Sequence, residues 1–374
     1  MSARYTRQTV LPEIGEAGQT RLGQARVLVI GAGGLGAPAL LYLTAAGVGL
    51  TTQGGRIGII DDDTVDQSNL QRQILFREDD QGRAKTEAAQ QHLTALNRDT
   101  QLITYPYRLN VSNALEILSD YDVIIDGSDN FKTKYLVNDA ATKLGKPVVY
   151  GSILGFEGQV SVFWAQRGPC YRCIYPQAPT SHVPNCAEAG TLGGIAGVVG
   201  SIQAVEACKL ALGPEHCLEY GLEPLIGKLL VFDALSWDIR KLDLEHKHDC
   251  PICSSAPEAI QLDDEGDDDQ GASCSVSGNP PPITLRDLGD LWDAGIPLTL
   301  IDVREPAEWA TGHLEGAIHI PLGDLLVRQE ALAALDDQTL MVVYCQHGIR
   351  SARAVSFLRA RGFDAFNLLV DWPA

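Results

Sequence analysis

The sequence lacks the features that would send it to a membrane or out of the cell. It contains no apolar run near the ~20 residues that an α-helix needs to span a bilayer. Its first residues, Met1 to Tyr5, contain no apolar core of a secretory signal. We therefore expect a cytoplasmic protein without a membrane partner.

Basic residues are scarce, with 29 Lys and Arg against 48 Asp and Glu and a formal net charge of −19. Six of the acids lie in one short run between Asp263 and Asp269. Binding to a nucleic-acid backbone requires clustered Lys and Arg, so this balance argues against nucleic acid as a partner. It leaves room for a small protein that uses local basic contacts.

The chain has nine cysteines, an odd number, and no export signal, so we do not expect a disulfide framework. Two Cys-x-x-Cys pairs, Cys170 with Cys173 and Cys250 with Cys253, have the spacing of a tetrahedral Zn²⁺ site. Four thiolate ligands leave no open position, which favours a structural metal. A redox-active Cys-x-x-Cys is the alternative.

At 374 residues the chain is long enough for two α/β domains. Residues 1–253 alternate strand and helix patterns, which predicts a Rossmann-like domain whose sheet is parallel at first and mixed later. Residues 254–282 are acidic and rich in Ser, Gly and Pro, a composition typical of a flexible linker. A smaller α/β domain is expected over 283–374. The predicted strands of the first domain are 26–30, 56–60, 101–105, 123–125, 147–150, 159–164 and 229–232.

A glycine-rich loop follows the first of these strands. Gly31, Gly33, Gly34 and Gly36 allow the backbone to approach a phosphate at the start of the next helix. Asp61, at the end of the second strand, can bind ribose hydroxyls. These features alone fit NAD, FAD or ATP.

Further polar residues favour ATP with Mg²⁺. Asn69, Arg72 and Lys85 follow Asp61 and offer an amide and two cations, and Asp129 follows the fourth strand. A triphosphate needs fixed cations and a metal-binding carboxylate, whereas a nicotinamide cofactor does not.

The motif series over residues 1–253 resembles the MoeB/ThiF family, the bacterial relatives of ubiquitin-activating enzymes. The matching segments are Arg4-Tyr5-x-Arg7-Gln8, Gly31 to Gly36, Asp61 to Val65, Asn69 to Gln73, Lys85 and Ser128 to Asn130.

This resemblance assigns the ribose to Asp61, the phosphates to Asn69, Arg72 and Lys85, and Mg²⁺ to Asp129. It also implies a homodimer, because Arg7 matches an arginine that reaches the neighbouring subunit's ATP site. Both Cys pairs match the family's structural zinc positions. Cys186 matches a cysteine of the crossing loop that can bond to the carrier or resolve an acyl-disulfide; a spectator thiol is the alternative.

The C-terminal part carries a second thiol site. The apolar strand 340–344 runs into Cys345, and a helix is predicted over 351–361. Backbone N–H groups at the helix start and the nearby Arg350 would favour a thiolate and cradle a persulfide. The segment from Leu300 to Pro321, with the Cys345 loop, resembles a rhodanese domain. Asp302 and Arg304 are expected to form a structural ion pair.

The combination resembles the fused adenylyltransferase–sulfurtransferases. It implies that ATP activates the C-terminal glycine of a ubiquitin-like sulfur carrier ending in Gly-Gly. A persulfide on Cys345, supplied by a donor such as a cysteine desulfurase, would then give the thiocarboxylate. The carrier could serve molybdopterin, thiamine, tRNA thiolation or amino-acid sulfur. A dinucleotide-dependent oxidoreductase with a rhodanese appendage and a non-catalytic scaffold are the alternatives.

Overall fold

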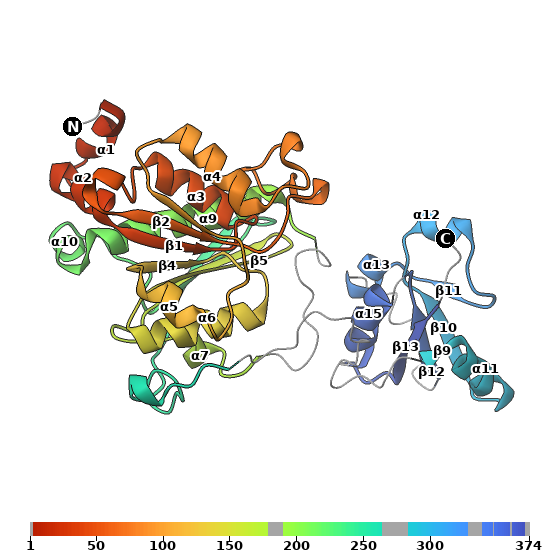
Figure 1. Ribbon diagram of the computed structural model, residues 1–374. Coiled ribbons are helices and arrows are strands. Elements are labelled where there is room, and N and C mark those ends of the chain that lie inside the picture. Colours follow the sequence, from red (N-terminus) through yellow and green to blue (C-terminus); the bar gives the residue numbers. More distant parts are fainter. Residues whose placement is uncertain are drawn as a thin grey trace. The chain divides into compact units, whose positions relative to one another are not determined.

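The protein forms two compact units, which are described separately (Figure 1). The computed structural model describes residues 3–178, 190–263, 283–327, 339–346, 348–359 and 361–370. Cys186 and most of the expected linker lie outside the described residues. Residues 254–263 remain with the first unit, since Ile260 is buried and its carbonyl accepts a hydrogen bond from Lys143 Nζ at 2.6 Å.

The first unit is built on an eight-stranded mixed sheet of order β3-β2-β1-β4-β5-β6-β7-β8. The strands from β3 to β5 are parallel, and β6 and β7 are antiparallel additions, as the sequence predicted. Strand β8 extends the sheet in antiparallel orientation. The strands are β1 (Arg26–Ile30), β2 (Arg56–Ile60), β3 (Leu102–Tyr105), β4 (Val123–Asp126), β5 (Val148–Leu154), β6 (Glu157–Phe163), β7 (Lys228–Asp233) and β8 (Asp238–Asp243).

Helices cover both faces of this sheet because its central strands are apolar on both sides. In β1, Val27 and Val29 pack into one core with α3 and α9, while Leu28 and Ile30 pack into a second core with α5 and α6. Figure 1 shows α3 and α9 on one face of the sheet and α5 and α6 on the other. The helices are α1 (Thr6–Thr9), α2 (Gly15–Gln24), α3 (Gly36–Ala45), α4 (Lys85–Leu96), α5 (Ala114–Ser119), α6 (Phe131–Leu144), α7 (Tyr171–Ile174), α9 (Gly193–Leu212) and α10 (Pro214–Glu219).

Helix α9 departs from the expectation that no apolar segment approaches membrane-spanning length. Its 20 residues are long and apolar enough to cross a membrane by length and composition. Half of its apolar window is nevertheless buried within the unit, where α9 packs against α3 and strands β4 to β6. It is therefore consistent with a core helix.

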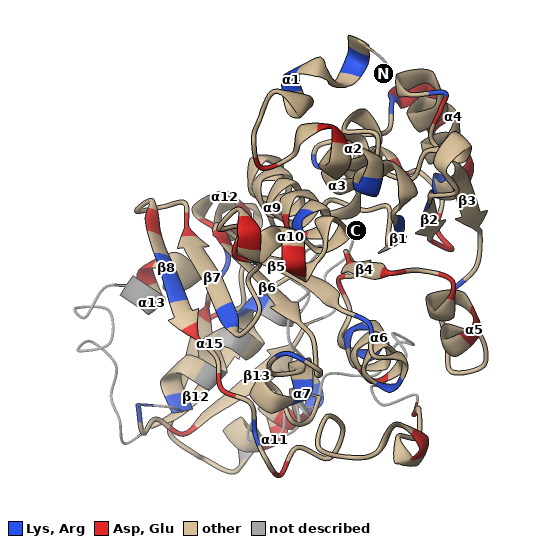
Figure 2. Cartoon of the chain, turned by 90° about the vertical axis from the view of Figure 1, so that its left-hand side faces the viewer, with Lys and Arg blue, Asp and Glu red and all other residues tan. Residues whose placement is uncertain are grey.

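Strand β8 was not predicted, because it has no buried apolar face. All six of its residues are exposed, and the strand carries charges of both signs, at Asp238, Arg240, Lys241 and Asp243 (Figure 2). Charged side chains on an edge strand discourage pairing with another chain.

The segment 50–55, which connects α3 to β2, forms a single tight turn. The short 3-10 helix η2 (Thr51–Gln53) ends at Gly54, whose φ of 78° is readily adopted only by glycine. The turn lies at the opposite end of β2 from Asp61, so it leaves the nucleotide edge of the sheet unchanged.

The second unit has a five-stranded parallel sheet of order β11-β10-β12-β13-β9. Its core lies around β12 and α15 and includes Val343, Cys345 and Val355. The strands are β9 (Ile283–Thr284), β10 (Leu298–Asp302), β11 (Ile318–His319), β12 (Leu340–Tyr344) and β13 (Ala365–Leu369), and the helices are α11 (Leu285–Asp293), α12 (Pro306–Thr311), α13 (Leu322–Val327) and α15 (Ile349–Arg359).

Candidate active sites and metal centre

The glycine loop joins β1 to α3 at the carboxyl edge of the parallel strands. Gly31 has a φ of 85°, and a Cβ on Gly36 would lie 1.8 Å from the Gly31 carbonyl oxygen, so both positions require glycine. A Cβ on Gly33 would meet nothing closer than 3.9 Å. Packing within the protein therefore does not require glycine at position 33. The space beside its backbone is open to a ligand at the start of α3.

Asp61 is tied to this loop. Its carboxylate accepts hydrogen bonds from the backbone N–H of Ala32 at 2.8 Å and of Asp63 at 2.9 Å. Burial raises the pKa of Asp61, against the opposing effect of Lys85. A half-buried acid fixed beside the glycine loop is well placed to accept from ribose hydroxyls.

Lys85 begins α4 and is buried, with its ammonium group 2.6 Å from the exposed carboxylate of Asp63. Arg72 packs against the glycine loop, since a Cβ on Gly34 would lie 3.5 Å from the Arg72 Cγ and Cδ atoms. Arg72 Nη1 donates to the Ser68 carbonyl at 3.0 Å. Two cations therefore approach the glycine loop from different segments.

The backbone of Asn69 forms hydrogen bonds with the segment that contains Arg72. The Asn69 carbonyl accepts from the N–H groups of Arg72 and Gln73, and its side-chain oxygen accepts from the N–H of Asp66 at 3.3 Å. A Cβ on Gly193 would lie 2.2 Å from the Gln71 carbonyl oxygen, so the first turn of α9 packs against the same segment.

The end of β4 holds two carboxylates in different environments. Asp126 is buried and binds Lys134 Nζ at 3.0 Å and the Ser128 hydroxyl at 2.6 Å. Asp129 is exposed and lies three residues after the end of β4, next to the Asn130 cap of α6. An exposed carboxylate at this edge has the chemistry that Mg²⁺ requires. The ion pair between Asp126 and Lys134 was not predicted from the sequence. In this pair the Asp126 carboxylate is bound to the Lys134 ammonium group.

Arg7 lies elsewhere in the unit. Its neighbour Gln8 donates to the Ala46 carbonyl at the C-terminal end of α3, whereas the glycine loop enters the N-terminal end. The ten residues of α3 separate these ends by about 15 Å. The chain therefore does not bring Arg7 to its own glycine loop.

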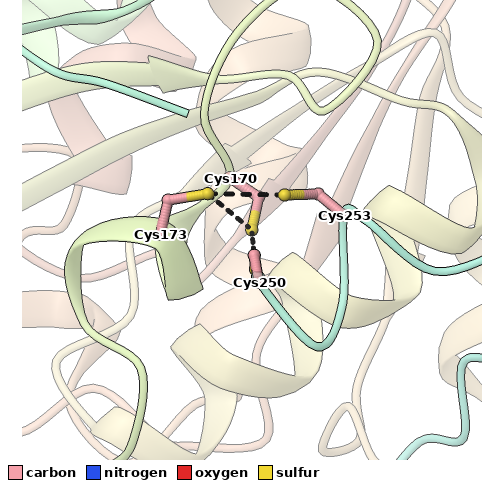
Figure 3. A group of neighbouring side chains, drawn as sticks. All are labelled: Cys170, Cys173, Cys250 and Cys253. Atoms are coloured by element: carbon pink, nitrogen blue, oxygen red, sulfur yellow. Dashed lines mark hydrogen bonds between the residues drawn. The ribbon is translucent and has the colours of Figure 1, made fainter. Parts of the chain in front are cut away.

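The four predicted zinc ligands converge (Figure 3). The Sγ atom of Cys170 lies 3.9 Å from that of Cys173 and 3.6 Å from that of Cys250, and Cys173 lies 3.4 Å from Cys253. Zn–S bonds of about 2.3 Å in a tetrahedron place the sulfur atoms about 3.8 Å apart. The cluster is consistent with structural zinc.

Neighbouring groups also suit a metal centre. The N–H of Lys247 donates to Cys173 Sγ at 3.5 Å, and His246 Nε2 lies 3.2 Å from Cys253 Sγ. Burial raises the pKa of Cys170 and raises that of Cys253 to about 12. Bound metal would displace these protons, so zinc binding should release protons.

In the second unit, Cys345 ends β12 and is buried. Ser351, which the sequence did not single out, provides two donors to Cys345 Sγ: its N–H at 3.4 Å and its hydroxyl at 3.3 Å. Gly348, with a φ of 79°, turns the loop directly into α15, which starts at Ile349 rather than at Ser351. His347 lies outside the described residues.

Two ion pairs flank this loop. Asp302 and Arg304 are both buried and 2.7 Å apart, which confirms the expected pair. Arg350 is bound by Glu308, a partner that the sequence did not reveal.

Comparison with known proteins assigns the two units. The ThiF family model matches residues 5–252, and the rhodanese-like domain model matches residues 284–373. The chain belongs to the ThiF family. It joins a ThiF-family adenylyltransferase to a C-terminal rhodanese domain.

Full-length relatives share both parts. The chain is 44% identical over 379 residues to "Probable adenylyltransferase/sulfurtransferase MoeZ" of Mycobacterium tuberculosis, covering 99% of this chain and 92% of the relative. It is 39% identical over 392 residues to "Adenylyltransferase and sulfurtransferase MOCS3" of Sus scrofa, covering 98% and 83%. It is 48% identical over 267 residues to "Sulfur carrier protein adenylyltransferase" of Thermus thermophilus, covering 70% and 94%.

Solved structures of E. coli MccB share the fold of the first unit. One of them aligns with a TM-score of 0.58 at 20% identity, over 68% of this chain and 74% of MccB. The family and its relatives make this chain an adenylyltransferase and sulfurtransferase. The oxidoreductase and scaffold alternatives are therefore wrong.

Proposed function

We propose that the ThiF unit uses ATP to adenylate the C-terminal glycine of a ubiquitin-like sulfur carrier. The observation that supports this most directly is the gathering of Asp61, Arg72 and Lys85 around the glycine loop, with Asp129 on the same edge of the sheet. In this proposal Asp61 binds the ribose, and Asn69, Arg72 and Lys85 bind the phosphates. The Thermus relative's name provides the substrate class.

The carrier carboxylate attacks the α-phosphorus, pyrophosphate leaves and an acyl-adenylate remains. Arg72 and Lys85 stabilise the negative charge that develops on the phosphates. Asp129 would hold Mg²⁺, which adds positive charge at the same phosphates when bound.

The rhodanese unit then provides sulfur. A donor such as a cysteine desulfurase transfers sulfane sulfur to the Cys345 thiolate, which becomes a persulfide while the donor leaves as a thiolate. The terminal sulfur attacks the acyl carbon, AMP leaves, and an acyl-disulfide joins Cys345 to the carrier. A second thiol, for which Cys186 is the candidate within this chain, attacks Cys345 Sγ. The carrier thiocarboxylate then leaves, and the new disulfide is reduced by a cellular dithiol.

The active form in this proposal is a cytoplasmic homodimer in which Arg7 completes the partner's ATP site. The distance of Arg7 from its own glycine loop supports this arrangement. An uncharged surface on α3 and α9 also supports a homodimer, because Tyr42, Val198 and Val205 are exposed there. Apolar side chains at Val198 and Val205 repeat at two helical turns, a pattern typical of a helix that packs against a partner.

Carrier-dependent exchange of labelled pyrophosphate into ATP tests the adenylation step. The purified, zinc-loaded protein is incubated with a panel of carriers that end in Gly-Gly. Exchange with one carrier supports the proposal and names the pathway. Absence of exchange with every carrier, from a protein that binds ATP, would refute it.

A further inference from the structure

The Cys345 loop is attached to the neighbouring helix α12 by a two-pronged ion pair. Arg350 Nη1 donates to Glu308 Oε2 and Nη2 to Oε1, each at 2.6 Å. The two side chains are 31% and 32% exposed, so the pair borders solvent. Parallel double bonds of this kind fix the plane of the guanidinium as well as its position.

Glu308 is itself held in place. Its Oε2 atom accepts from the N–H of Glu305 at 3.0 Å, which closes the first turn of α12. At the other end of the helix, the buried Arg304 donates to the Gly312 carbonyl at 2.7 Å. The carboxylate therefore projects from a helix that is fixed at both ends. The hydrogen bonds from Arg350 lower the pKa of Glu308 to about 2, so this group is ionised at neutral pH.

Arg350 also interacts with the Cys345 sulfur. Its pKa is raised first by the hydrogen bonds to Glu308 and, to a smaller extent, by the Cys345 sulfur. The next residue in the chain, Ser351, donates its N–H and its hydroxyl to the same sulfur. The guanidinium therefore interacts with a permanent anion and with a sulfur atom that carries negative charge as a thiolate.

We propose that Glu308 is a positioning residue for sulfur transfer, which holds the Arg350 guanidinium beside the Cys345 sulfur. This inference rests on the proposed role of Cys345 as the sulfur carrier of this chain. A free arginine side chain loses rotamer freedom when it binds an anion. Two bonds to a fixed carboxylate remove that freedom before the sulfur arrives. Arg350 can then stabilise the charge on the thiolate and, after sulfur is accepted, on the persulfide.

A double-mutant cycle tests this coupling in the full-length protein. Glu308→Ala, Arg350→Ala and the double variant are alkylated with iodoacetamide over a range of pH, and mass spectrometry follows the peptide that contains Cys345. Iodoacetamide is neutral, so it reports the charge on sulfur and not the binding of an anion. We expect each single change to move the midpoint of the pH profile upward by a similar amount. The double variant should match Arg350→Ala alone.

Sulfur transfer from thiosulfate to cyanide gives a second readout. At an assay pH below both midpoints, an upward shift of about one unit lowers the thiolate fraction about tenfold. Higher intrinsic nucleophilicity offsets part of that loss, so the rate falls about threefold. Glu315→Ala is the matched control, because it removes an exposed carboxylate of the same unit outside the ion pair. Its profile should remain that of the unmodified protein. Glu308→Asp keeps the charge but is one methylene shorter. The midpoint of its alkylation profile should lie between those of the unmodified protein and Glu308→Ala.

Other results would overturn the inference. An unchanged alkylation profile in Glu308→Ala with a lower melting temperature would make the ion pair a purely structural tie. Additive shifts in the double variant would mean that Glu308 acts on Cys345 without Arg350. A separate failure, in which Cys345→Ala still transfers sulfur from thiosulfate, would instead remove the proposed function on which the inference rests.

Discussion

Lys85 combines an ion pair with Asp63 and a proposed phosphate-binding role at one residue. Its side chain is 7% exposed, but its partner Asp63 is 64% exposed. Loss of the lysine would therefore leave the Asp63 carboxylate in water, where an unpaired charge costs little. The effect of a substitution on folding and its effect on catalysis can be separated at this position.

We predict that Lys85→Met lowers pyrophosphate exchange by about 10²–10³-fold, because a phosphate-binding cation is lost from the transition state. The melting temperature should change little. Lys241→Met, which removes an exposed lysine from β8, is the control and should retain full exchange. A Lys85→Met protein with normal exchange would remove this residue from the proposed phosphate site.

The ionisation of Glu308 makes the stability of the second unit depend on pH in the acid range. Its pKa is lowered from 4.5 to about 2 by the Arg350 hydrogen bonds. A lowered carboxyl pKa stabilises the folded state above the unfolded value, and this stabilisation is lost as pH falls from 4.5 toward 2.

Glu308→Gln lacks this contribution at every pH. We therefore predict that the unmodified protein melts at a higher temperature than the variant near neutral pH, and that the difference disappears near pH 2. Calorimetry of both proteins across that range measures it. A constant difference at all pH values would contradict the assignment of the shift to this ion pair.

At the scale of elements, the apolar strands were the most predictable part of the fold. The bounds of β1, β2 and β12 agree with the prediction, because each is a short buried run of β-branched and aliphatic residues. Strand β8 escaped prediction because its exposed, charged residues show no such pattern.

The residues of the candidate sites also divide into those that the sequence predicted and those that it did not. The glycines, Asp61, Lys85 and the cysteines were recognisable because their chemistry depends on residue type and short spacing. Glu308 and Arg350 are 42 residues apart, and they meet only because β10 pairs in parallel with β12. The contact of α9 with the Arg72 segment is also long-range. A single sequence carries no direct signal for such contacts.

The Cys₄ cluster joins segments that are far apart in the chain. Cys170 and Cys250 are separated by 80 residues, and closing a loop of that length by a cross-link stabilises a fold by about 4.5 kcal/mol in the chain-entropy model. We predict one zinc per chain by native mass spectrometry. Cys250→Ser should lose the metal and melt at a lower temperature.

Cys217→Ser is the matched control, since this buried cysteine lies outside the cluster. It should keep the zinc. Full metal content in the Cys250→Ser protein, or equal melting temperatures with and without a chelator, would contradict a structural zinc at this position.

At the scale of the whole molecule, the position of Arg7 predicts that each active site needs two chains. Arg7→Ala and Asp129→Ala homodimers should both be inactive in pyrophosphate exchange. After the two are mixed and their subunits exchange, each heterodimer contains one site with Asp129 and the partner's Arg7.

Random exchange makes half of the dimers mixed, each with one of its two sites intact, so about a quarter of the unmodified rate should return. Mixing Arg7→Ala with itself is the control. If Arg7 served its own chain, the mixture would stay inactive. Val205→Glu, which places a charge on the exposed face of α9, should abolish the recovery by separating the subunits.

The most direct test of the whole account is the mass of a sulfur carrier after incubation with the full-length protein, ATP, a persulfide donor and a reductant. The account predicts the mass increase that results when sulfur replaces one oxygen of the terminal carboxylate. The increase should require ATP and should be absent with Cys345→Ala, which should still exchange pyrophosphate. Thiocarboxylate formation by Cys345→Ala at the unmodified rate would contradict the account.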